Sequence, residues 1–534
     1  MWSKLVGLEK AIIVAGVIVW ILFSVYAAPL FGDADVYLFR DAASNLLHGF
    51  GFTTASFEHS QSFQRLLYSS YTPLTQWTSL PFAAVFQSGS MGETFYDLTL
   101  SAIAAVAVLW LLTERLAPGK LRLFAIALLA ISLPLGYLGA GPQRPEEVTF
   151  LFLLALLLCL RTADSILRVA ACGAIGGLAF LAEPIGGVLA SFLIGGALLL
   201  PIVVSGFAGI RRRLALTLVA ASAFLVPVAV TALCFQHQDP QSVARFLYQA
   251  KVGGYSRTES SSELVDKRTD RTGDLASVAP QQKAGKYVYA LRVWKMLGAL
   301  AIEIELSTVL VALAWLVLCV LSKGTLAARA ALFSLGLVFY LAVFIAFPLQ
   351  GNYLILTRCL FPFALLLDWG GCRKALRNER VIEAIAILNL IVPLPELALN
   401  TLTRIESRNS YIEAKNQAVF LKDYLVAHNS ENGVVLLPTT QYYLYKQSTQ
   451  NIFDPDYLSS QHDLRQIVAI ANCDTATRFT KPGEMPLPEG LDANQFALIA
   501  PGGEAVAVTF MGHKLMSRNW TWTCDLYGAK GVAK

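Results

Sequence analysis

Gly32-Asp33-Ala34-Asp35-Val36-Tyr37 follows an apolar run from Ala11 to Phe31 and places two carboxylates in its first polar positions. The run is long enough to cross a bilayer as a helix, which takes about 20 apolar residues. A first membrane span that ends here brings Asp33 and Asp35 to the rim of the bilayer. Ionisable groups near membrane depth are costly, so their presence indicates a functional site.

A purely structural explanation of the two aspartates stays open. An amphipathic helix is expected from Val36 to Leu47, ended by Gly49 and Gly51. An aspartate directly before a helix is an ordinary N-cap, because its carboxylate accepts hydrogen bonds from the first backbone amides. One aspartate could cap the helix while the other acts chemically.

The composition indicates an integral membrane protein. Of 534 residues, 55% are hydrophobic and only 15% are charged, and the mean hydropathy is +0.54. The net charge of +5 is small. Since basic residues gather mainly at the ends of apolar runs, membrane topology explains them and no nucleic-acid partner is expected.

The basic residues also predict which side of the membrane each loop faces. With Lys4 and Lys10 in the cytoplasm and the first run as an uncleaved span, nearly every later basic cluster falls on the cytoplasmic side. The fold class is therefore predicted as an α-helical polytopic membrane protein with about 11 transmembrane helices. The N-terminus is expected in the cytoplasm and the C-terminus outside.

The predicted transmembrane part covers residues 1–399, with outer loops at about 32–93, 139–147, 236–295 and 348–358. A helix lying at the interface is expected from Tyr71 to Phe86, and a tight pair of spans turns at Glu183-Pro184. Other expected spans are Thr94–Leu112, Leu123–Leu138, a run from about Val148 to Arg161, Leu214–Phe235, Met296–Leu321, Ala330–Phe347, a run ending near Trp369, and Val381–Leu399.

Residues 400–534 are more polar and predict a small extracytoplasmic α/β domain. A helical pattern covers Tyr411–His428, and strand-like runs are Val434–Leu437, Tyr442–Tyr445, Ala497–Ala500 and Ala505–Phe510. Cys473 and Cys524 are the two cysteines of this part, and in an oxidising compartment they could form a disulfide.

The residues that suggest chemistry are acids and arginines on the predicted outer side. No phosphate-binding loop, dinucleotide fingerprint or HExxH motif occurs, and six scattered histidines give little support to a histidine site. A carboxylate there could accept a proton from a nucleophile, while arginines hold an anionic leaving group. The acids are Asp33, Asp35, Asp41, Glu146, Glu147 and Glu183, and the arginines are Arg40, Arg65, Arg144 and Arg358.

Each group also has a structural alternative. Arg144 and Arg358 could snorkel to lipid headgroups, and Glu183 next to Pro184 fits an ordinary turn. Tyr71 and Trp77 fit an interfacial aromatic belt.

Three stretches, in order, resemble the GT-C glycosyltransferases, which include protein O-mannosyltransferases, lipid A aminoarabinose transferases and rhizobial galacturonosyltransferases. The first is Asp33 with Tyr37 and the helix Ala43–Gly49. The second is Tyr71-Thr-Pro-Leu-Thr-Gln-Trp77, and the third is Arg144-Pro-Glu146. The sequence departs from the common form of the family at Ala34, where many members have a second acid, and at Thr72, where they have proline.

The resemblance implies an inverting transfer of a sugar from a polyprenyl-phosphate donor to a lipid, polysaccharide or protein acceptor on the outer face. Asp33 or Asp35 would be the catalytic carboxylate, Arg144 and Arg358 would bind the donor phosphate, and Tyr37, Tyr71 and Trp77 would line the substrate loop. Glu146, Glu147 and Asp41 would be supporting acids. No cofactor is implied, although carboxylates near a phosphate could hold a divalent metal ion.

Two other functions stay open. An envelope-polysaccharide polymerase or ligase would suit the long outer loop Gln236–Trp294. A lipid or sugar transporter is the third candidate. Transporters tend to place ionisable residues in the middle of spans and to show internal repeats, whereas the spans here are nearly free of charge and no repeat is evident.

Overall fold

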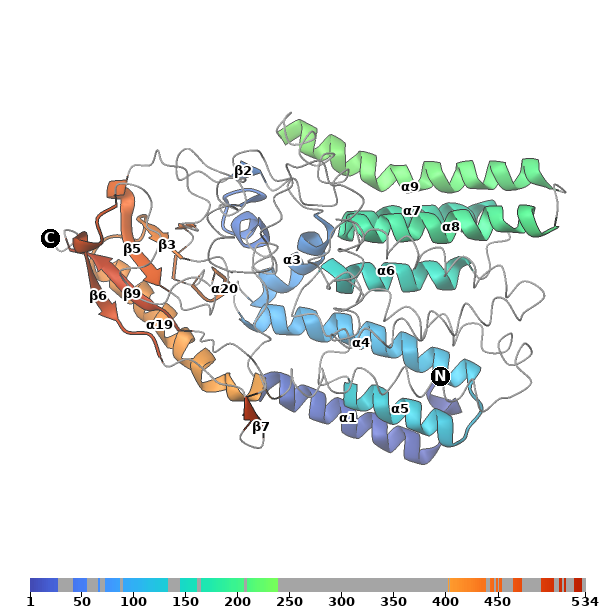
Figure 1. Ribbon diagram of the computed structural model, residues 1–534, viewed down its shortest axis with the longest axis horizontal. Coiled ribbons are helices and arrows are strands. Elements are labelled where there is room, and N and C mark those ends of the chain that lie inside the picture. The colour runs from blue at the N-terminus through green and yellow to red at the C-terminus, as the bar shows by residue number, and fades with distance from the viewer. Residues whose placement is uncertain are drawn as a thin grey trace, which may run out of the picture. The chain divides into compact units, whose positions relative to one another are not determined.

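The structure is a computed structural model (Figure 1). It describes residues 1–26, 42–54, 66–67, 73–86, 90–132, 145–160, 165–205, 209–238, 402, 404–437, 442–445, 448–449, 451–453, 464–472, 491–503, 509–510, 513–514 and 523–530. These residues are mostly helical, with a small sheet near the C-terminus. The chain divides into two units. The first comprises Met1–Tyr68, Pro73–Val148 and Leu394–Lys534, and the second comprises Ser69–Thr72 and Thr149–Pro393.

Three long helices of the first unit pack side by side. They are α1 (Gly7–Tyr26), α4 (Ser90–Arg115) and α5 (Lys120–Ser132), and the 3-10 helix η1 (Trp2–Lys4) precedes α1. Gly16 of α1 lies so close to α5 that a Cβ there would be 2.6 Å from the Cβ of Ala130. Small residues allow two helix backbones to approach in this way.

The contacts along these helices fix their directions. Glu9 contacts Arg122 near the beginning of α1 and α5, and Gly16 meets Ala130 further along both. Helices α1 and α5 therefore run parallel. The end of α4 lies at the beginning of α1, because Glu114 pairs with Lys4 at 2.6 Å, so α4 runs antiparallel to both.

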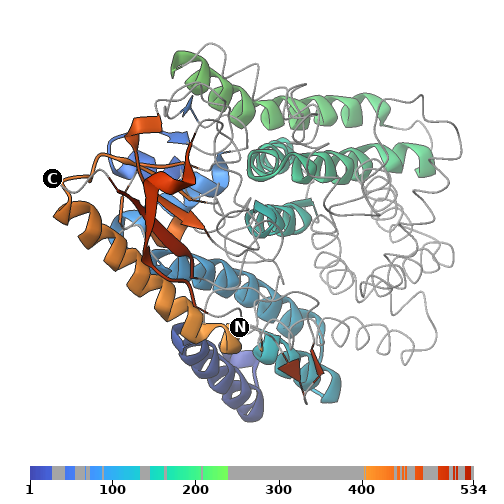
Figure 2. The same ribbon diagram turned by 60° about the vertical axis from the view of Figure 1, so that its left-hand side comes forward.

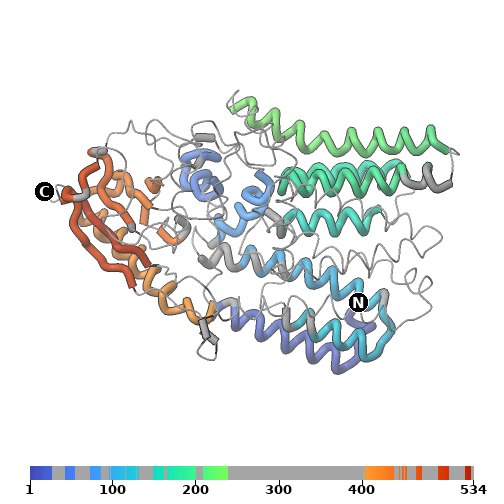
Figure 3. Tube along the Cα trace, in the orientation of Figure 1, coloured from blue at the N-terminus to red at the C-terminus, as the bar shows by residue number. Residues whose placement is uncertain are grey.

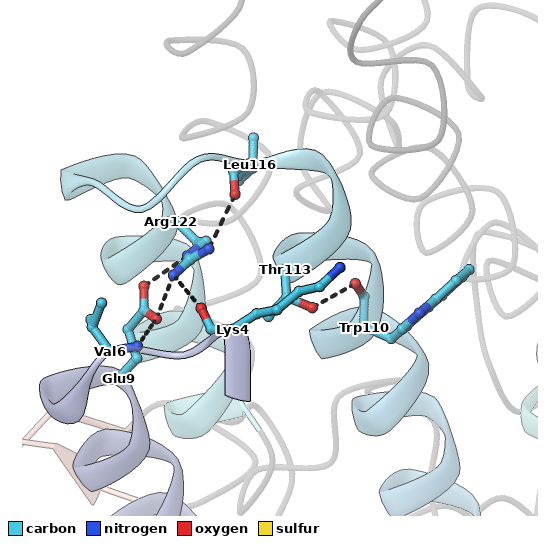
Figure 4. A network of polar contacts seen from close by, with 7 residues as sticks. All are labelled: Lys4, Val6, Glu9, Trp110, Thr113, Leu116 and Arg122. Atoms are coloured by element: carbon cyan, nitrogen blue, oxygen red, sulfur yellow. Dashed lines mark hydrogen bonds and ion pairs between the residues drawn. The ribbon is translucent and has the colours of Figure 1, made fainter. Parts of the chain in front are cut away.

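A buried ion pair joins the beginnings of α1 and α5 (Figure 4). The Arg122 guanidinium donates from Nε to Glu9 Oε1 and from Nη2 to Glu9 Oε2, both at 2.8 Å. Arg122 also donates to the carbonyls of Lys4 and Leu116, and the Val6 amide donates to Glu9 Oε2. The two side chains are 2% and 1% exposed, so hydrogen bonds replace the water that both charges lose.

The second unit contains three helices that pack through glycines. They are α7 (Ile166–Ala182), α8 (Pro184–Ser205) and α9 (Ile210–Gln238). Gly173 and Gly177 of α7 leave no room for a Cβ against the backbone of α9. Helix α6 (Pro145–Leu160) enters this unit at Thr149. The turn expected at Glu183-Pro184 is confirmed, because α7 ends at Ala182 and α8 begins at Pro184.

Among the described residues, α9 alone is both long enough and apolar enough to cross a membrane by length and composition. It contains the expected span Leu214–Phe235, and it continues to Gln238, three residues into the stretch expected to be an outer loop. Shorter apolar stretches are Leu98–Glu114, Val148–Leu160, Ile166–Ala182 and Pro184–Leu199. The four spans expected between Met296 and Leu399 lie outside the described residues.

The C-terminal residues of the first unit form a five-stranded sheet with the order β4-β3-β5-β9-β6. Strand β3 is parallel to β4 and β5, whereas β9 is antiparallel to β5 and β6. The strands are β3 (Val434–Leu436), β4 (Ile452–Phe453), β5 (Ile467–Asn472), β6 (Phe496–Ala500) and β9 (Asp525–Ala529). The remaining short elements of this part of the chain are α20 (Tyr442–Tyr445), η6 (Leu464–Gln466), η8 (Ala493–Gln495), and the separate pair β7 (Thr509–Phe510) and β8 (His513–Lys514).

Helix α19 (Arg408–Ala427) lies along one face of this sheet (Figure 2). Its Leu421 and Leu425 share a buried cluster with Val435 of β3. The alternate residues Val434 and Leu436 belong to a second buried cluster. Successive side chains of a strand point to opposite faces, so β3 is buried on both faces.

Most of the expected elements of this part are confirmed. Helix α19 corresponds to the helical pattern, and β3 and β6 to two of the strand-like runs. Of Ala505–Phe510, only Thr509–Phe510 is described, as β7.

The strand expected at Tyr442–Tyr445 is wrong, because these residues form the helical turn α20. The consecutive residues Leu444 and Tyr445 are both fully buried in the cluster beneath α19. In a strand they would point to opposite faces, so packing in one core overrides the strand preference of tyrosine.

Cys524, directly before β9, is disulfide-bonded. Three described cysteines, Cys159, Cys172 and Cys234, are not disulfide-bonded, so none of them is its partner. Cys473 lies outside the described residues and directly follows β5 in the sequence. The last pair of the β5–β9 ladder is Asn472 with Asp525.

Because Cys473 follows Asn472 and Cys524 precedes Asp525 in the sequence, we expect the two cysteines to be bonded to each other. Peptide mapping without reduction should recover the Cys473–Cys524 linked peptide, and Cys473→Ser should leave Cys524 reactive toward maleimide. Cys234, which is free and exposed, is the positive control for labelling. A linked peptide that joins Cys524 to another cysteine would contradict the prediction.

We also expect Arg122→Met to lower the melting temperature in detergent by the equivalent of about 3 kcal/mol, because it leaves the Glu9 carboxylate buried and unpaired. The double variant Glu9→Leu with Arg122→Met should recover most of the loss, since apolar side chains of similar size often replace a buried pair without cost. Thermal unfolding followed by tryptophan fluorescence measures both.

Lys4→Met is the control. It breaks the exposed pair with Glu114 but keeps the Lys4 carbonyl that Arg122 binds, and exposed pairs contribute little. If Arg122→Met has the same melting temperature as Lys4→Met, the buried pair does not stabilise the packing of these helices.

Candidate functional site

Most of the residues predicted to act lie outside the described part of the chain. Asp33, Asp35, Tyr37, Asp41, Tyr71, Arg144 and Arg358 all fall there. Glu146 and Glu147 lie in the first turn of α6. Trp77 lies near the beginning of α3 (Leu74–Phe86). The structure therefore describes the candidate site mainly by the helices and strands that flank its predicted segments.

The end of α1, which precedes the Gly32–Tyr37 stretch, is joined to the beginning of α19. Arg408 donates from Nε to the Tyr26 carbonyl at 3.1 Å, and its guanidinium lies 4.2 Å from the centre of the Tyr26 ring. Arg404 lies 4.7 Å from the centre of the Phe23 ring. Cation–π contacts of this kind add to the hydrogen bond, so the C-terminal α/β part is attached to that end of α1.

The segment that carries Arg144 follows α5, and α5 runs parallel to α1. Chain segments that follow two parallel helices leave the bundle at the same end. The Asp33 and Arg144 segments therefore start from the same end of the first unit's helices, and α19 begins there as well.

Helix α3 begins within the quoted stretch Tyr71–Trp77 and packs against α4. Thr78 Oγ1 lies 2.6 Å from the Tyr96 hydroxyl. The Phe82 and Tyr96 rings meet edge to face at 5.3 Å. Tyr96 is only 2% exposed, so this polar and aromatic contact fixes the helix on α4.

A short helix at residues 42–47 lies before α3 and ends as predicted. Gly49 and Gly51 have φ values of 83° and 73°. The Gly49 and Phe50 amides donate to the Leu46 and Asn45 carbonyls, which is the Schellman arrangement that favours glycine. The chain then enters β1 (Thr53–Thr54), which pairs with β2 (Leu66–Leu67).

This short helix and turn reach α3 through an aromatic contact. The Phe52 ring lies 6.4 Å from the Trp77 ring, and Trp77 is half-buried. Asn45 is fully buried and donates from Nδ2 to the Thr53 carbonyl at 2.8 Å, which holds the turn.

Sequence reasoning missed two buried polar residues directly before Trp77. Thr75 is 2% exposed and Gln76 is 0% exposed. In the described part of the chain, Thr75 Oγ1 and both amide atoms of Gln76 are among the buried polar atoms without a hydrogen-bond partner. The signal in the sequence is two polar residues between Pro73-Leu74 and Trp77, but burial itself is not visible there.

Within the described ranges, no group of three histidine, cysteine, aspartate or glutamate residues could hold a metal ion.

No model of a known protein family matches the chain, and no curated protein matches it in sequence. A crystal structure of ArnT from Cupriavidus metallidurans bound to undecaprenyl phosphate is similar at 12% identity and a TM-score of 0.43, over 98% of each chain. A match of this strength supports no conclusion about this chain.

We expect Tyr96→Phe to lower the melting temperature by the equivalent of about 1 kcal/mol, because it removes the hydroxyl that meets Thr78. Thr78→Val should have a similar effect. The double variant should lose less stability than the two single variants added together, since both changes remove the same hydrogen bond. Thermal unfolding of the four proteins measures this coupling, and additive losses would show that the contact does not attach α3 to α4.

Proposed function

We propose that the chain is a multi-pass membrane glycosyltransferase of the GT-C type. It transfers a sugar from a polyprenyl-phosphate donor to a lipid, polysaccharide or protein acceptor at the outer face of a bacterial inner membrane. The apolar composition and the helices described above support a membrane protein. The ordered motifs after α1, at the start of α3 and at the start of α6 support the enzyme class.

The observation that carries the proposal is the parallel packing of α1 and α5. It lets the segments with Asp33 and Arg144 start from one end of the same bundle, so that a base and a phosphate-binding arginine can serve one reaction. The opposite end holds Lys4, Lys120 and Arg122. By the positive-inside rule that end is expected to be cytoplasmic, which supports an outer position for the Asp33 segment.

The disulfide at Cys524 supports the same orientation. Disulfides persist in the periplasm and other oxidising compartments and are rare in the cytosol. Arg408 joins the C-terminal part to the end of α1 that precedes Asp33. Both observations support a proposed reaction site and an α/β part on the same, extracytoplasmic side.

In the proposed mechanism, Asp33 or Asp35 accepts the proton of the acceptor hydroxyl. The acceptor oxygen then forms a bond to the anomeric carbon from the face opposite the phosphate, the bond from that carbon to the phosphate oxygen breaks, and the configuration inverts. Arg144 and Arg358 bind the departing polyprenyl phosphate, whose charge grows in the transition state. No cofactor takes part in this step.

The remaining predicted residues have supporting roles in the proposal. Glu146, Glu147 and Asp41 tune the charge around the donor phosphate. Tyr37, Tyr71 and Trp77 line the path of the substrate, with Trp77 held by Phe52.

Sugar transfer by the purified protein tests the proposal. The assay offers polyprenyl phosphates linked to neutral, amino or uronic sugars to wild type, Asp33→Asn and Asp35→Asn. We expect one of the two variants to lose at least about a hundredfold in rate, because general bases contribute about 10²–10⁴-fold. Asp423→Asn, an exposed change on α19, should retain the full rate.

Two results would contradict the proposal at different levels. If wild type turns over and both variants keep the full rate, the protein is still a transferase. Neither aspartate then takes part in its mechanism. Failure of wild type to consume any donor or to bind undecaprenyl phosphate would favour a polymerase, ligase or transporter.

A further inference from the structure

The beginning of α3 contains three buried polar atoms in two adjacent residues. They are Thr75 Oγ1, Gln76 Oε1 and Gln76 Nε2, and in the described part of the chain none has a hydrogen-bond partner. A buried polar group without a partner loses its hydration and gains nothing in return. Native proteins hold few such groups, and each one calls for an explanation.

Another buried glutamine shows what a purely structural role looks like. Gln417 of α19 donates from Nε2 to the carbonyls of Pro501 and Cys524, at 2.7 and 3.0 Å. Its Oε1 accepts from the Tyr445 hydroxyl and the Cys524 amide, both at 3.0 Å. All four hydrogen-bonding positions of this amide are used, whereas Gln76 uses none.

The side of α3 that holds Gln76 is not the side that attaches the helix to α4. Thr78 and Phe82 contact Tyr96 of α4. Gln76 lies two residues before Thr78, about 200° away around a helix with 3.6 residues per turn. The unpartnered amide of Gln76 therefore does not belong to the contact with α4, whereas Thr75, about 100° from Gln76 around the helix, lies nearer the side that faces α4.

The polar groups near Gln76 already have partners of their own. Ser79 Oγ donates to the Gln76 carbonyl at 2.9 Å, Thr78 Oγ1 meets Tyr96, and Asn45 donates to Thr53. Among the described residues around this place, the open hydrogen-bonding capacity is that of Thr75 and Gln76, next to the half-buried Trp77 ring.

The chemistry of the open atoms selects the type of ligand. A phosphate presents only acceptor oxygens, so it would leave the acceptor Gln76 Oε1 unsatisfied. Sugar hydroxyls both donate and accept, so two adjacent hydroxyls can satisfy an amide on both its atoms while a third bond reaches the threonine hydroxyl. A neutral amide and a hydroxyl also bind such groups without any charge.

We propose that Thr75 and Gln76 form a subsite that binds adjacent hydroxyls of the sugar on the donor and so determine which sugars the enzyme accepts. This inference rests on the proposed function, and it adds specificity-determining residues to it. Removal of one sugar hydroxyl would return the amide to its unpartnered state, and sites of this kind discriminate strongly against analogues that lack the group they bind.

The test uses Gln76→Met and Thr75→Val, which keep side-chain volume and remove hydrogen bonding. In the ligand-free protein we expect an unchanged or higher melting temperature, because an unpartnered polar group becomes apolar. The affinity for undecaprenyl-phosphate sugars that wild type turns over should fall about tenfold or more. The affinity for undecaprenyl phosphate without a sugar should stay the same.

Gln417→Met is the matched control. It should lower the melting temperature, because it leaves two carbonyls, a hydroxyl and an amide of the α/β part without partners. The folded fraction of this variant should bind the donor like wild type. The variants Gln76→Met and Gln417→Met are thus expected to have opposite effects on stability and on donor affinity.

The possible failures are distinguishable. If wild type transfers sugar and Gln76→Met binds the donor equally well, the subsite is wrong and the proposed function stands. Equal losses for the donor and for undecaprenyl phosphate alone would overturn the sugar assignment, and a melting temperature as low as that of Gln417→Met would make Gln76 structural. If wild type binds neither ligand, both proposals fail.

Discussion

The bidentate pair between Glu9 and Arg122 is the interaction on which the arrangement of the first unit depends. It joins the beginnings of α1 and α5 in a place that excludes water, and Gly16 then lets the two helices stay in close contact along their length. A pair of this geometry accepts one register only, since a shift of either helix would leave a charge buried alone. The common direction of α1 and α5, which lie side by side (Figure 3), follows from this pair together with the contact between Gly16 and Ala130, and the segments after the two helices therefore start at the same end.

Polar groups in the buried parts of the molecule have two different roles. At Arg122 and at Gln417, the hydrogen-bonding atoms meet partners from segments far apart in the sequence. Burial also raises the pKa of Tyr445, so its hydroxyl keeps the proton that it donates to Gln417. Thr75 and Gln76 are buried as deeply without such bonds, and proteins tend to retain such a cost where function requires it.

The sequence predicted the elements whose signal is local. Continuous apolar length located α9, Glu183-Pro184 marked a turn, and paired glycines ended the short helix before β1. Tyr442–Tyr445 was assigned wrongly because a shared core, which no local pattern shows, decides its conformation. Gln76 escaped notice for the same reason. Of the predicted site residues, Trp77, Glu146 and Glu147 lie in described helices, whereas Asp33, Asp35, Arg144 and Arg358 lie outside the described residues and their roles stay predictions.

The contact between Arg408 and Tyr26 joins positions 382 residues apart. During synthesis α1 leaves the ribosome before its partner at Arg408, which emerges only after all the predicted spans have been made. The end of α1 is therefore without this partner while those spans are being made. Formation of the contact is therefore a late step of assembly, because a chain interrupted before α19 cannot make it.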